Sequence, residues 1–277
     1  MSDISYNFAG KHVLVVGGSR GIGKATMLQF LKSGANVYCA SRVSPKQQGV
    51  HWVQCDIRNE RDIHSLFSYI DRKTNKLDFV INVAGTNLCA PIEDINSKEW
   101  DRVLDTNLRS FFLICKEAVS RMKKHGYGRI VNVSSSAHYG IDFEFDNMNG
   151  EKKYAGFDTY KKSKLANVMF TYELAKRIEG TGITANCLHP GFVSTNFGKN
   201  NNIFWRNAIR LAMMLTAISV KDGAKTSIHL ACSDEVKDIT GKFFANCEVK
   251  KGSSKAKNEE HNQKLWELSE EFVKPFL

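Results

Sequence analysis

The sequence predicts a doubly wound α/β fold, in which helices cover both faces of a parallel sheet within a single domain. Short β-branched runs alternate with segments of helical apolar spacing along most of the chain. The first of these runs breaks into a glycine turn that leads straight into a helix. Only four prolines occur in 277 residues and no low-complexity linker is present, so we expect residues 1–277 to form one domain.

Each expected element follows from its own pattern. The strands are short runs rich in Val, Ile and Leu, and the helices carry apolar residues three and four positions apart, as Met27, Phe30 and Leu31 do. The expected strands are residues 11–16, 36–40, 77–82, 129–133, 183–188 and 242–246. The expected helices are residues 24–33, 60–72, 98–123 and 159–178, helical stretches between 205 and 232, and a helix that follows a basic segment within 250–277.

The composition is that of an ordinary globular protein. Hydrophobic residues make up 42% of the chain and charged residues 25%, which excludes disorder and collagen-like structure. No run of about 18 apolar residues occurs, and Asp3 and Asn7 lie where a secretory signal needs a basic start and an apolar core. We therefore expect a cytoplasmic protein without a transmembrane anchor, and peripheral contact with a membrane surface stays open.

The net charge of +10 favours anionic ligands, because long-range attraction steers them to the protein. The 39 basic residues are scattered and lack the interleaved aromatic residues of a nucleic-acid platform, so no nucleic-acid partner is expected. The seven cysteines are at least fifteen positions apart, which gives neither a redox pair nor a zinc-ligand spacing. We expect a small-molecule partner and no metal, and self-association into a homo-oligomer stays open.

The glycine turn at residues 16–23 predicts a dinucleotide site in a Rossmann-type fold. Gly17 allows the tight turn, Gly21 lets the backbone approach a pyrophosphate, and Gly23 lets helix and strand pack closely. The N-terminus of the helix adds partial positive charge. We therefore expect the turn to hold a nicotinamide dinucleotide.

The end of the second strand favours NADP(H) over NAD(H). Proteins that bind NAD usually place an acid there, which binds the ribose 2′-OH. Here the strand ends in Ser41-Arg42, and no carboxylate occurs between Gly23 and Asp56. Arg42, together with Arg20 of the glycine turn, can form charge-assisted bonds to a 2′-phosphate. The alternative is that Arg42 is an ordinary surface arginine.

A tyrosine with a lysine four residues later is a candidate proton donor. Carbonyl reduction needs a proton, and a phenol with a reference pKa of about 10 has to be tuned to supply one near neutrality. The lysine lies on the same helix face, where its ammonium stabilises the phenolate. Three pairs have this spacing: Tyr69/Lys73, Tyr160/Lys164 and Tyr172/Lys176. The spacing alone leaves all three open.

Position in the fold favours the second pair. Ligands of open parallel sheets bind outside the carboxyl ends of the strands. The strand at 129–133 ends in three serines that include Ser135, and Tyr160 begins the next long helix. Tyr69 and Tyr172 lie well inside their helices, where packing or exposure is expected. Tyr160 is therefore the predicted acid/base.

These segments resemble the short-chain dehydrogenase/reductase family over nearly the whole chain. Residues 16–23 are similar to its TGxxxGIG motif, with Val16 in place of the threonine. Residues 82–85 are similar to its NNAG motif, with Val83 in place of the second asparagine. The PGFVST sequence at 190–195 resembles PGxVxT. From Arg129 onward the segments RIVNVSSSAH, YKKSKLANVMFTYELAKR and KLWELSEEF resemble the retinol dehydrogenase-like branch.

The resemblance implies a role for each matching residue. By this likeness Ser135 hydrogen-bonds the substrate oxygen and Tyr160 is the acid/base. Lys164 tunes Tyr160 and holds the nicotinamide ribose, and Asn107 keeps a proton-relay water in place. The expected cofactor contacts are Gly17, Ser19, Arg20, Gly21, Ile22, Gly23, Arg42, Asp56, Ile57, Asn82, Ala84, Gly85, Tyr160, Lys164, Pro190, Gly191, Val193 and Thr195.

The segment 203–220 is expected to form an amphipathic helix. Trp205, Ala208 and Ile209 share one side of it and Arg206 lies on another, which suits either core packing or a lid at 196–220 over an apolar pocket. The resemblance and this lid predict an NADP(H)-dependent oxidoreductase that interconverts an apolar or lipid-like aldehyde or ketone and the alcohol.

Three alternatives remain beside this activity. One is an NAD(H)-dependent oxidoreductase of hydroxysteroids or acyl chains. Another is a non-catalytic NADP-binding sensor or scaffold, which predicts loss of a tyrosine or lysine that this chain retains. A serine hydrolase using His138 or His189 is disfavoured, because the one GxSxG match, around Ser19, lies in the glycine turn that is expected to hold the dinucleotide. We therefore expect packing or loop roles for both histidines.

Overall fold

The computed structural model describes residues 7–87, 97–147, 156–193 and 217–274. These residues form an eight-stranded sheet in the order β3-β2-β1-β4-β5-β6-β7-β8, which is parallel except for the antiparallel edge strand β8. The strands are β1 His12–Val16, β2 Asn36–Ser41, β3 Val50–Gln54, β4 Phe79–Asn82, β5 Gly128–Val133, β6 Ile183–Leu188, β7 Phe243–Ala245 and β8 Glu248–Lys250. The predicted fold class is confirmed.

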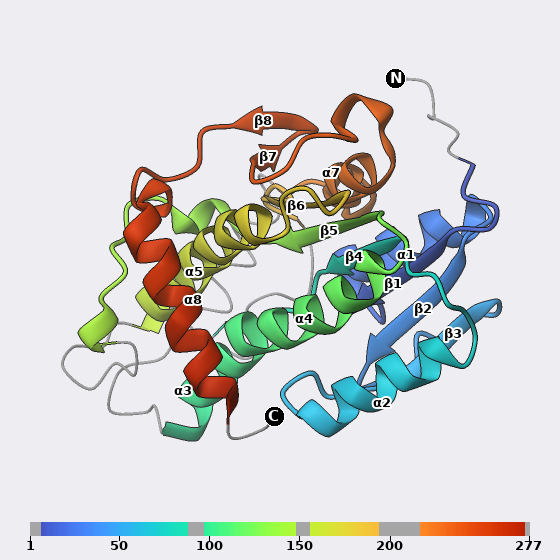
Figure 1. The fold of residues 1–277 in the computed structure, drawn as a ribbon, viewed down its shortest axis with the longest axis horizontal. Helices are drawn as coiled ribbons and strands as arrows, with labels where there is room; N and C mark the ends of the chain where they lie inside the picture. Colours follow the sequence, from blue (N-terminus) through green and yellow to red (C-terminus); the bar gives the residue numbers. More distant parts are fainter. Residues whose placement is uncertain (1–6, 88–96, 148–155, 194–216, 275–277) are drawn as a thin grey trace.

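Helices cover both faces of this sheet (Figure 1). Helices α2, α4 and α5 pack on one face, with α8 against α5, and α1 and α7 pack side by side on the other. Their bounds are α1 Gly21–Lys32, α2 Glu60–Asp71, α3 Ser97–Leu104, α4 Ser110–Lys123, α5 Gly156–Arg177, α7 Val220–Cys232 and α8 Glu259–Val273.

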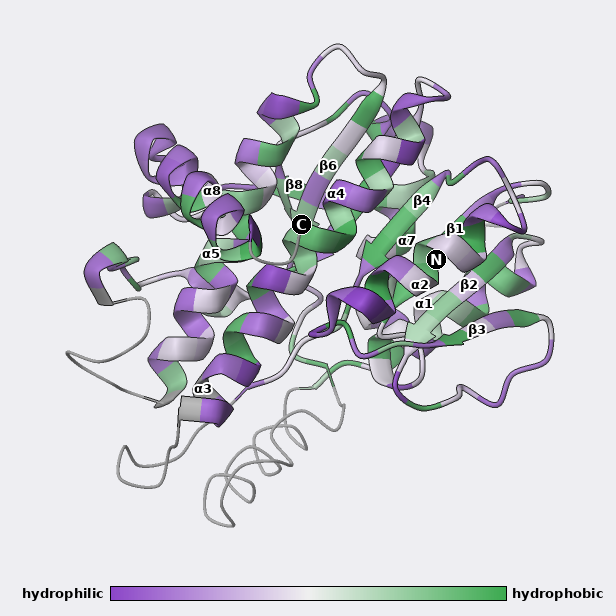
Figure 2. Cartoon of the chain, turned by 60° about the horizontal axis from the view of Figure 1, so that its bottom comes forward, coloured by the Kyte–Doolittle hydropathy of each residue, from purple (hydrophilic) through white to green (hydrophobic). Residues whose placement is uncertain are grey.

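Two hydrophobic cores result, because successive residues of a strand point to opposite faces. In β1, Leu14 and Val16 join the core beneath α2, α4 and α5, whereas Val13 and Val15 join the core beneath α1 and α7. Figure 2 colours each residue by hydropathy and shows mostly apolar strands at the centre and many hydrophilic residues on the outer sides of the helices.

Helix α2 shows how local sequence fixes an element. Ile63, Leu66, Phe67 and Ile70 are buried at the spacing of one helix face. The side chain of Asn59 caps the helix by accepting a hydrogen bond from the backbone N–H of Arg61.

The structure differs from the sequence prediction in three respects: one expected helix is interrupted, two edge strands were not expected, and two helices begin earlier than expected. The helix expected at 98–123 is interrupted by a π-helical turn, Asp105–Arg109, between α3 and α4. Strands β3 and β8 are absent from the prediction, because they form the two edges of the sheet and their residues are only partly buried or exposed. Helices α1 and α5 begin at Gly21 and Gly156, each three residues before its expected start. Most of the predicted lid lies outside the described residues, since residues 194–216 are not among them.

Candidate active site

The glycine turn lies against the segment that follows β4. Gly17 has a φ of +87°, and a Cβ atom there would lie 2.9 Å from the Cα of Ala84. A Cβ atom on Gly23 would collide with the carbonyl oxygen of Gly17. The backbone N–H groups of Val83 and Ala84 both donate to the carbonyl of Val16 at 3.0 Å. The fold thus brings together two groups of predicted cofactor contacts at the carboxyl ends of β1 and β4.

The start of α1 fits a phosphate group. No side chain caps this helix terminus, and its first turn holds no acidic residue. Ser19 is half-buried and Arg20 is exposed beside it, and Gly21 takes a φ of +55°. Uncapped N–H groups with nearby positive charge form an anion site, so the residues present suit a pyrophosphate.

Positive charge also gathers beyond β2. Arg42 is exposed and makes no ion pair with the described part of the chain. Asp56 is bound by the guanidinium of Arg58, which holds the pKa of that carboxyl below its usual range, and Arg42 lowers the pKa further. Asp56 is therefore engaged by Arg58, which sequence reasoning missed. Ile57 next to it is buried in the core.

Tyr160 and Lys164 meet the carboxyl end of β5. Lys164 is only 4% exposed, its Nζ donates to the carbonyl of Val133 at 3.2 Å, and its own carbonyl accepts from the Ser134 hydroxyl at 2.8 Å. The Nζ atom lies 5.9 Å from the centre of the Tyr160 ring. Burial lowers the pKa of Lys164 to about 8. The amino group thus exchanges its proton close to neutral pH, beside a buried phenol.

Gly85 lies next to this lysine. A Cβ atom on Gly85 would lie 3.4 Å from Lys164 Nζ and 3.6 Å from Asn107 Oδ1. The absence of a side chain keeps open the space beside the two polar groups. The predicted residues Gly85, Asn107, Tyr160 and Lys164 are therefore neighbours.

Ser135 follows Ser134 and is half-buried. Its Oγ accepts a hydrogen bond from the backbone N–H of Ala137 at 3.1 Å. Its carbonyl accepts from both the backbone N–H and the ring of His138. With Oγ used as an acceptor, the hydroxyl proton can be donated to a substrate oxygen.

Asn107 lies in the π-helical turn and joins two segments. Its Oδ1 accepts from the N–H of Thr86 at 2.9 Å, and its Nδ2 donates to the carbonyl of Thr86 at 2.8 Å and to Ser163 Oγ at 2.9 Å. The Ser163 hydroxyl donates to the carbonyl of Tyr160 at 2.8 Å. Sequence reasoning missed Thr86 and Ser163, and the implied role of Asn107 in holding a water stays a prediction.

A buried chain of polar side chains braces this end of the sheet. Asn82 Nδ2 donates to Asn132 Oδ1 at 2.7 Å, and Asn132 Nδ2 donates to Thr171 Oγ1 at 3.0 Å. All three residues are fully buried. The chain links β4, β5 and α5, so the predicted contact Asn82 faces the protein interior.

The segment after β6 lies against α7, close to the start of α1. Val193 is buried against Gly223 of α7, and Ile22 also lies near that glycine. Gly191 has a φ of +87°, and Pro190 before it is half-buried. The predicted contact Thr195 lies outside the described residues.

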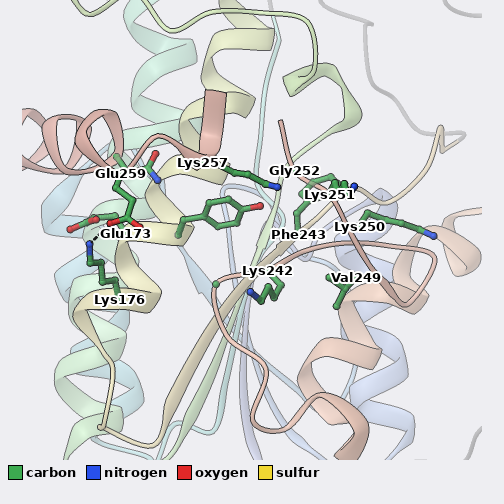
Figure 3. A pocket seen from close by; sticks show the side chains of 13 residues that line it. Glu173, Lys176, Lys242, Phe243, Val249, Lys250, Lys251, Gly252, Lys257 and Glu259 are labelled. Atoms are coloured by element: carbon green, nitrogen blue, oxygen red, sulfur yellow. Dashed lines mark hydrogen bonds and ion pairs between the residues drawn. The ribbon is translucent and has the colours of Figure 1, made fainter. Parts of the chain in front are cut away.

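The other two Tyr–Lys pairs lie elsewhere. The Tyr69 hydroxyl approaches His51 Nδ1 at 3.5 Å, beside β3. Tyr172 lines an open groove of about 620 Å³ between α5, the β7–β8 hairpin and the start of α8 (Figure 3). The lysines that line this groove include Lys176, Lys251 and Lys257. Neither pair lies with Ser135 at the carboxyl end of β5.

Comparison with known proteins identifies the family. Residues 11–204 match the family model described as short chain dehydrogenase. Retinol dehydrogenase 12 of Mus musculus is 32% identical over 280 residues, which cover 95% of this chain and 86% of that protein. A short chain dehydrogenase from Leptospira borgpetersenii with bound NAD+ has a TM-score of 0.71 and 26% identity, and the match covers 88% of this chain and 94% of that one.

A further structure shares the fold at lower identity. A Beutenbergia cavernae protein described as an NAD(P)-dependent gluconate 5-dehydrogenase, with NADP bound at low occupancy, has a TM-score of 0.72 and 23% identity. The match covers 87% of this chain and 97% of that one.

The chain belongs to the short-chain dehydrogenase family, in its retinol dehydrogenase-like branch. It is thus a member of a family of oxidoreductases that use a nicotinamide cofactor, as the resemblance of its motifs predicts. Solved neighbours hold NAD+ in one case and NADP in another, so the family alone does not choose between them. Within the described ranges no helix is long and apolar enough to cross a membrane, and no cluster of His, Cys, Asp and Glu side chains suits a metal ion.

Proposed function

We propose that the protein is an NADP(H)-dependent oxidoreductase that interconverts an apolar aldehyde or ketone and the corresponding alcohol. The observation that carries this proposal is the burial of Lys164 beside Tyr160, where β5 ends in Ser134 and Ser135. An ammonium that is kept from water next to a phenol stabilises the phenolate and thereby eases proton transfer.

Each side chain of the site has a separate role in the proton transfer. A bound nicotinamide supplies or accepts the hydride. In the direction of reduction the Tyr160 hydroxyl gives its proton to the substrate oxygen, and Lys164 stabilises the phenolate that remains. The Ser135 hydroxyl donates a hydrogen bond to the same oxygen, which gains negative charge during the reaction. Asn107 and Ser163 hold the segment after β4 to the first turns of α5.

The preference for NADP(H) rests on the arginines beyond β2. A 2′-phosphate carries negative charge, and Arg42 forms no ion pair with a carboxylate of the described residues, since Asp56, which senses its charge, is bound by Arg58. Asp56 is already neutralised by Arg58, so it adds little repulsion toward a phosphate.

An apolar substrate is supported by two lines of reasoning. The relative from Mus musculus is named for retinol, a long apolar alcohol. The amphipathic pattern at 203–220 suits a lid over an apolar pocket, although residues 194–216 lie outside the described part.

The test is turnover of NADPH and NADH with a panel of aldehydes and ketones. We expect oxidation of NADPH with apolar aldehydes and a lower kcat/KM with NADH. Tight NADPH binding without turnover on any carbonyl or alcohol would favour the sensor or scaffold instead. A higher kcat/KM with NADH would favour the NAD(H)-dependent alternative.

A further inference from the structure

His138 is a buried imidazole next to the proposed substrate-binding serine. It lies three residues after Ser135 and is fully buried. Its ring packs against the rings of Tyr139 at 4.0 Å and Phe243 at 4.6 Å between centroids. No proposed proton-transfer step uses it, yet both of its ring nitrogens are engaged.

The two bonds of the ring fix its tautomer. His138 Nε2 lies 3.2 Å from the backbone N–H of Ser253, which can only donate, so Nε2 must accept. The ring proton therefore lies on Nδ1, which donates to the carbonyl of Ser135 at 2.7 Å. Both bonds exist together only while the imidazole is neutral.

The surroundings keep the imidazole neutral. Burial is the main cause that lowers the pKa of His138, and His189 at the end of β6 lowers it further. The carbonyl of Ser135 acts in the opposite direction. Phe243 of β7 carries no charge, and Tyr139 and Ser253 are neutral at physiological pH.

A second bond ties the same two segments. The Tyr139 hydroxyl donates to the carbonyl of Lys251 at 2.6 Å. Between Lys251 and Ser253, Gly252 is buried against Tyr172, whose hydroxyl a Cβ atom would strike. Figure 3 shows Lys251 and Gly252 above Phe243, at the wall of the groove. Residues 251–253 thus form a strap over the stretch that follows β5.

We propose that His138 is a positioning residue for the reaction: held by the strap at Ser253, it fixes the carbonyl of Ser135 and thereby the direction of the Ser135 hydroxyl. This inference rests on the role of Ser135 under the proposed function. A serine that donates to an oxygen gaining negative charge matters more in the transition state than in the bound substrate. Loss of the tie should therefore lower kcat with little change in KM.

The test compares three variants of the full-length protein with saturating NADPH. His138→Phe keeps an aromatic ring and removes both bonds, and we expect kcat to fall about 10- to 100-fold, with KM and the NADPH Kd within about threefold of wild type. His138→Asn keeps an amide donor near the Nδ1 position, so it should recover most of the lost kcat. His12→Phe, a ring at the start of β1, is the matched control and should keep wild-type turnover.

A double-mutant cycle with Ser135→Ala separates positioning from general support of the fold. If His138 acts through Ser135, His138→Phe should lower kcat no further in the Ser135→Ala background. Three results would each overturn the proposal. The losses of kcat in His138→Phe and Ser135→Ala could be additive, His138→Asn could lose as much kcat as His138→Phe, or the main effect could be on the Kd for NADPH. Should His138→Phe fail to fold, the cycle is run with His138→Leu, which also removes both bonds.

Failure of the underlying function has a different signature. Full turnover in Ser135→Ala, with Tyr160→Phe inactive, would remove the role of Ser135 and this inference with it, while the oxidoreductase would stand. Full turnover in Tyr160→Phe would instead remove the proposed acid/base.

Discussion

Helix α5 carries two Tyr–Lys pairs of identical spacing, and their surroundings differ in nearly every respect. Lys164 is buried against the carbonyl of Val133, and burial lowers its pKa to about 8. Lys176 is exposed and binds Glu259 of α8 at 2.8 Å, a hydrogen bond that raises its pKa. Burial raises the pKa of Tyr172, which makes it a weaker acid. The spacing decides which side chains share a helix face. Burial at the carboxyl end of β5 decides which of the two lysine ammonium groups can stabilise a phenolate.

The strongest way to break this comparison is to remove each hydroxyl in turn. Tyr160→Phe keeps the ring and removes the proton donor, so kcat should fall by about 1000-fold or more, while NADPH binding is retained. Tyr172→Phe and Tyr69→Phe are matched controls and should remain active. Steady-state kinetics and a fluorescence titration with NADPH measure both effects. Wild-type turnover in Tyr160→Phe would show that the acid/base is another group.

Substitution of Lys164 and of Lys176 should have different effects on the stability of the protein as well as on its activity. Lys164→Met removes a buried charge, whose desolvation costs about 3 kcal/mol, and loses one hydrogen bond, worth about 1 kcal/mol. We expect a Tm higher by about 5 °C together with a loss of kcat of about 100-fold. Lys176→Met should change neither. Scanning calorimetry and kinetics test this, and a Tm lowered by Lys164→Met would contradict the account of its burial.

The two arginines beyond β2 also differ in their surroundings, because Arg58 forms an ion pair with Asp56 and Arg42 forms none with the described residues. Arg42→Asp replaces a phosphate-binding cation with an acid that repels phosphate and can bind a 2′-OH. The ratio of kcat/KM for NADPH over NADH should fall about 10- to 100-fold, through the KM for NADPH. Arg61→Asp, an exposed arginine of α2, is the control. An unchanged ratio would exclude Arg42 from the cofactor site.

The shifted pKa of Lys164 should appear in the alkaline limb of the kcat/KM profile. Below about pH 8 this lysine holds its proton, and above it the ammonium that stabilises the phenolate is lost, so kcat/KM for reduction should decline up to tenfold per pH unit. Between about pH 8 and the ordinary lysine pKa near 10.5, Lys164 by itself would make stability rise with pH, because its amino group binds fewer protons in the folded state than in the unfolded state. Burial raises the pKa of the Cys55 and Cys115 thiols to about 12, which acts in the opposite direction over the same range. The contribution of Lys164 is therefore measured as the difference in pH dependence between wild type and Lys164→Met. Lys176→Met should leave the pH dependence of kcat/KM and of stability unchanged in this range. A wild-type kcat/KM that does not decline above about pH 8 would contradict the role assigned to Lys164.

The smallest effect concerns substrate length. Burying one more methylene contributes at most about 0.8 kcal/mol, so kcat/KM should rise several-fold per two carbons along a series of straight-chain aldehydes. The series is measured from four to ten carbons with NADPH. A flat response would remove the apolar-substrate hypothesis and leave 203–220 as core packing.

The sequence predicts the alternation of strands and helices well, because buried strands such as β1 and β4 consist mostly of consecutive apolar residues. It does not predict β3, because that strand lies at the edge and none of its residues is fully buried. The π-helical turn at 105–109 was also missed, since it lies within an unbroken helical pattern.

The candidate site was predictable in its residue types and less so in its connections. Tyr160 and Lys164 were chosen by their place in the predicted fold. The bonds from Asn107 to Thr86 and Ser163 join residues up to 56 positions apart, and nothing in the local sequence of Asn107 indicates them. Arg58 carried a weak signal, as a basic residue two positions after Asp56.

The tie between His138 and Ser253 also bears on when the protein becomes active during its synthesis. The two residues are 115 positions apart, so the contact cannot form until Ser253 has been synthesised. A nascent chain that has reached residue 193 already contains every proposed catalytic side chain, yet it lacks the N–H group that orients His138. Full turnover should therefore be reached only after Ser253 has joined the fold, and a chain without this contact should keep the kcat expected for His138→Phe, about 10- to 100-fold below that of the wild type.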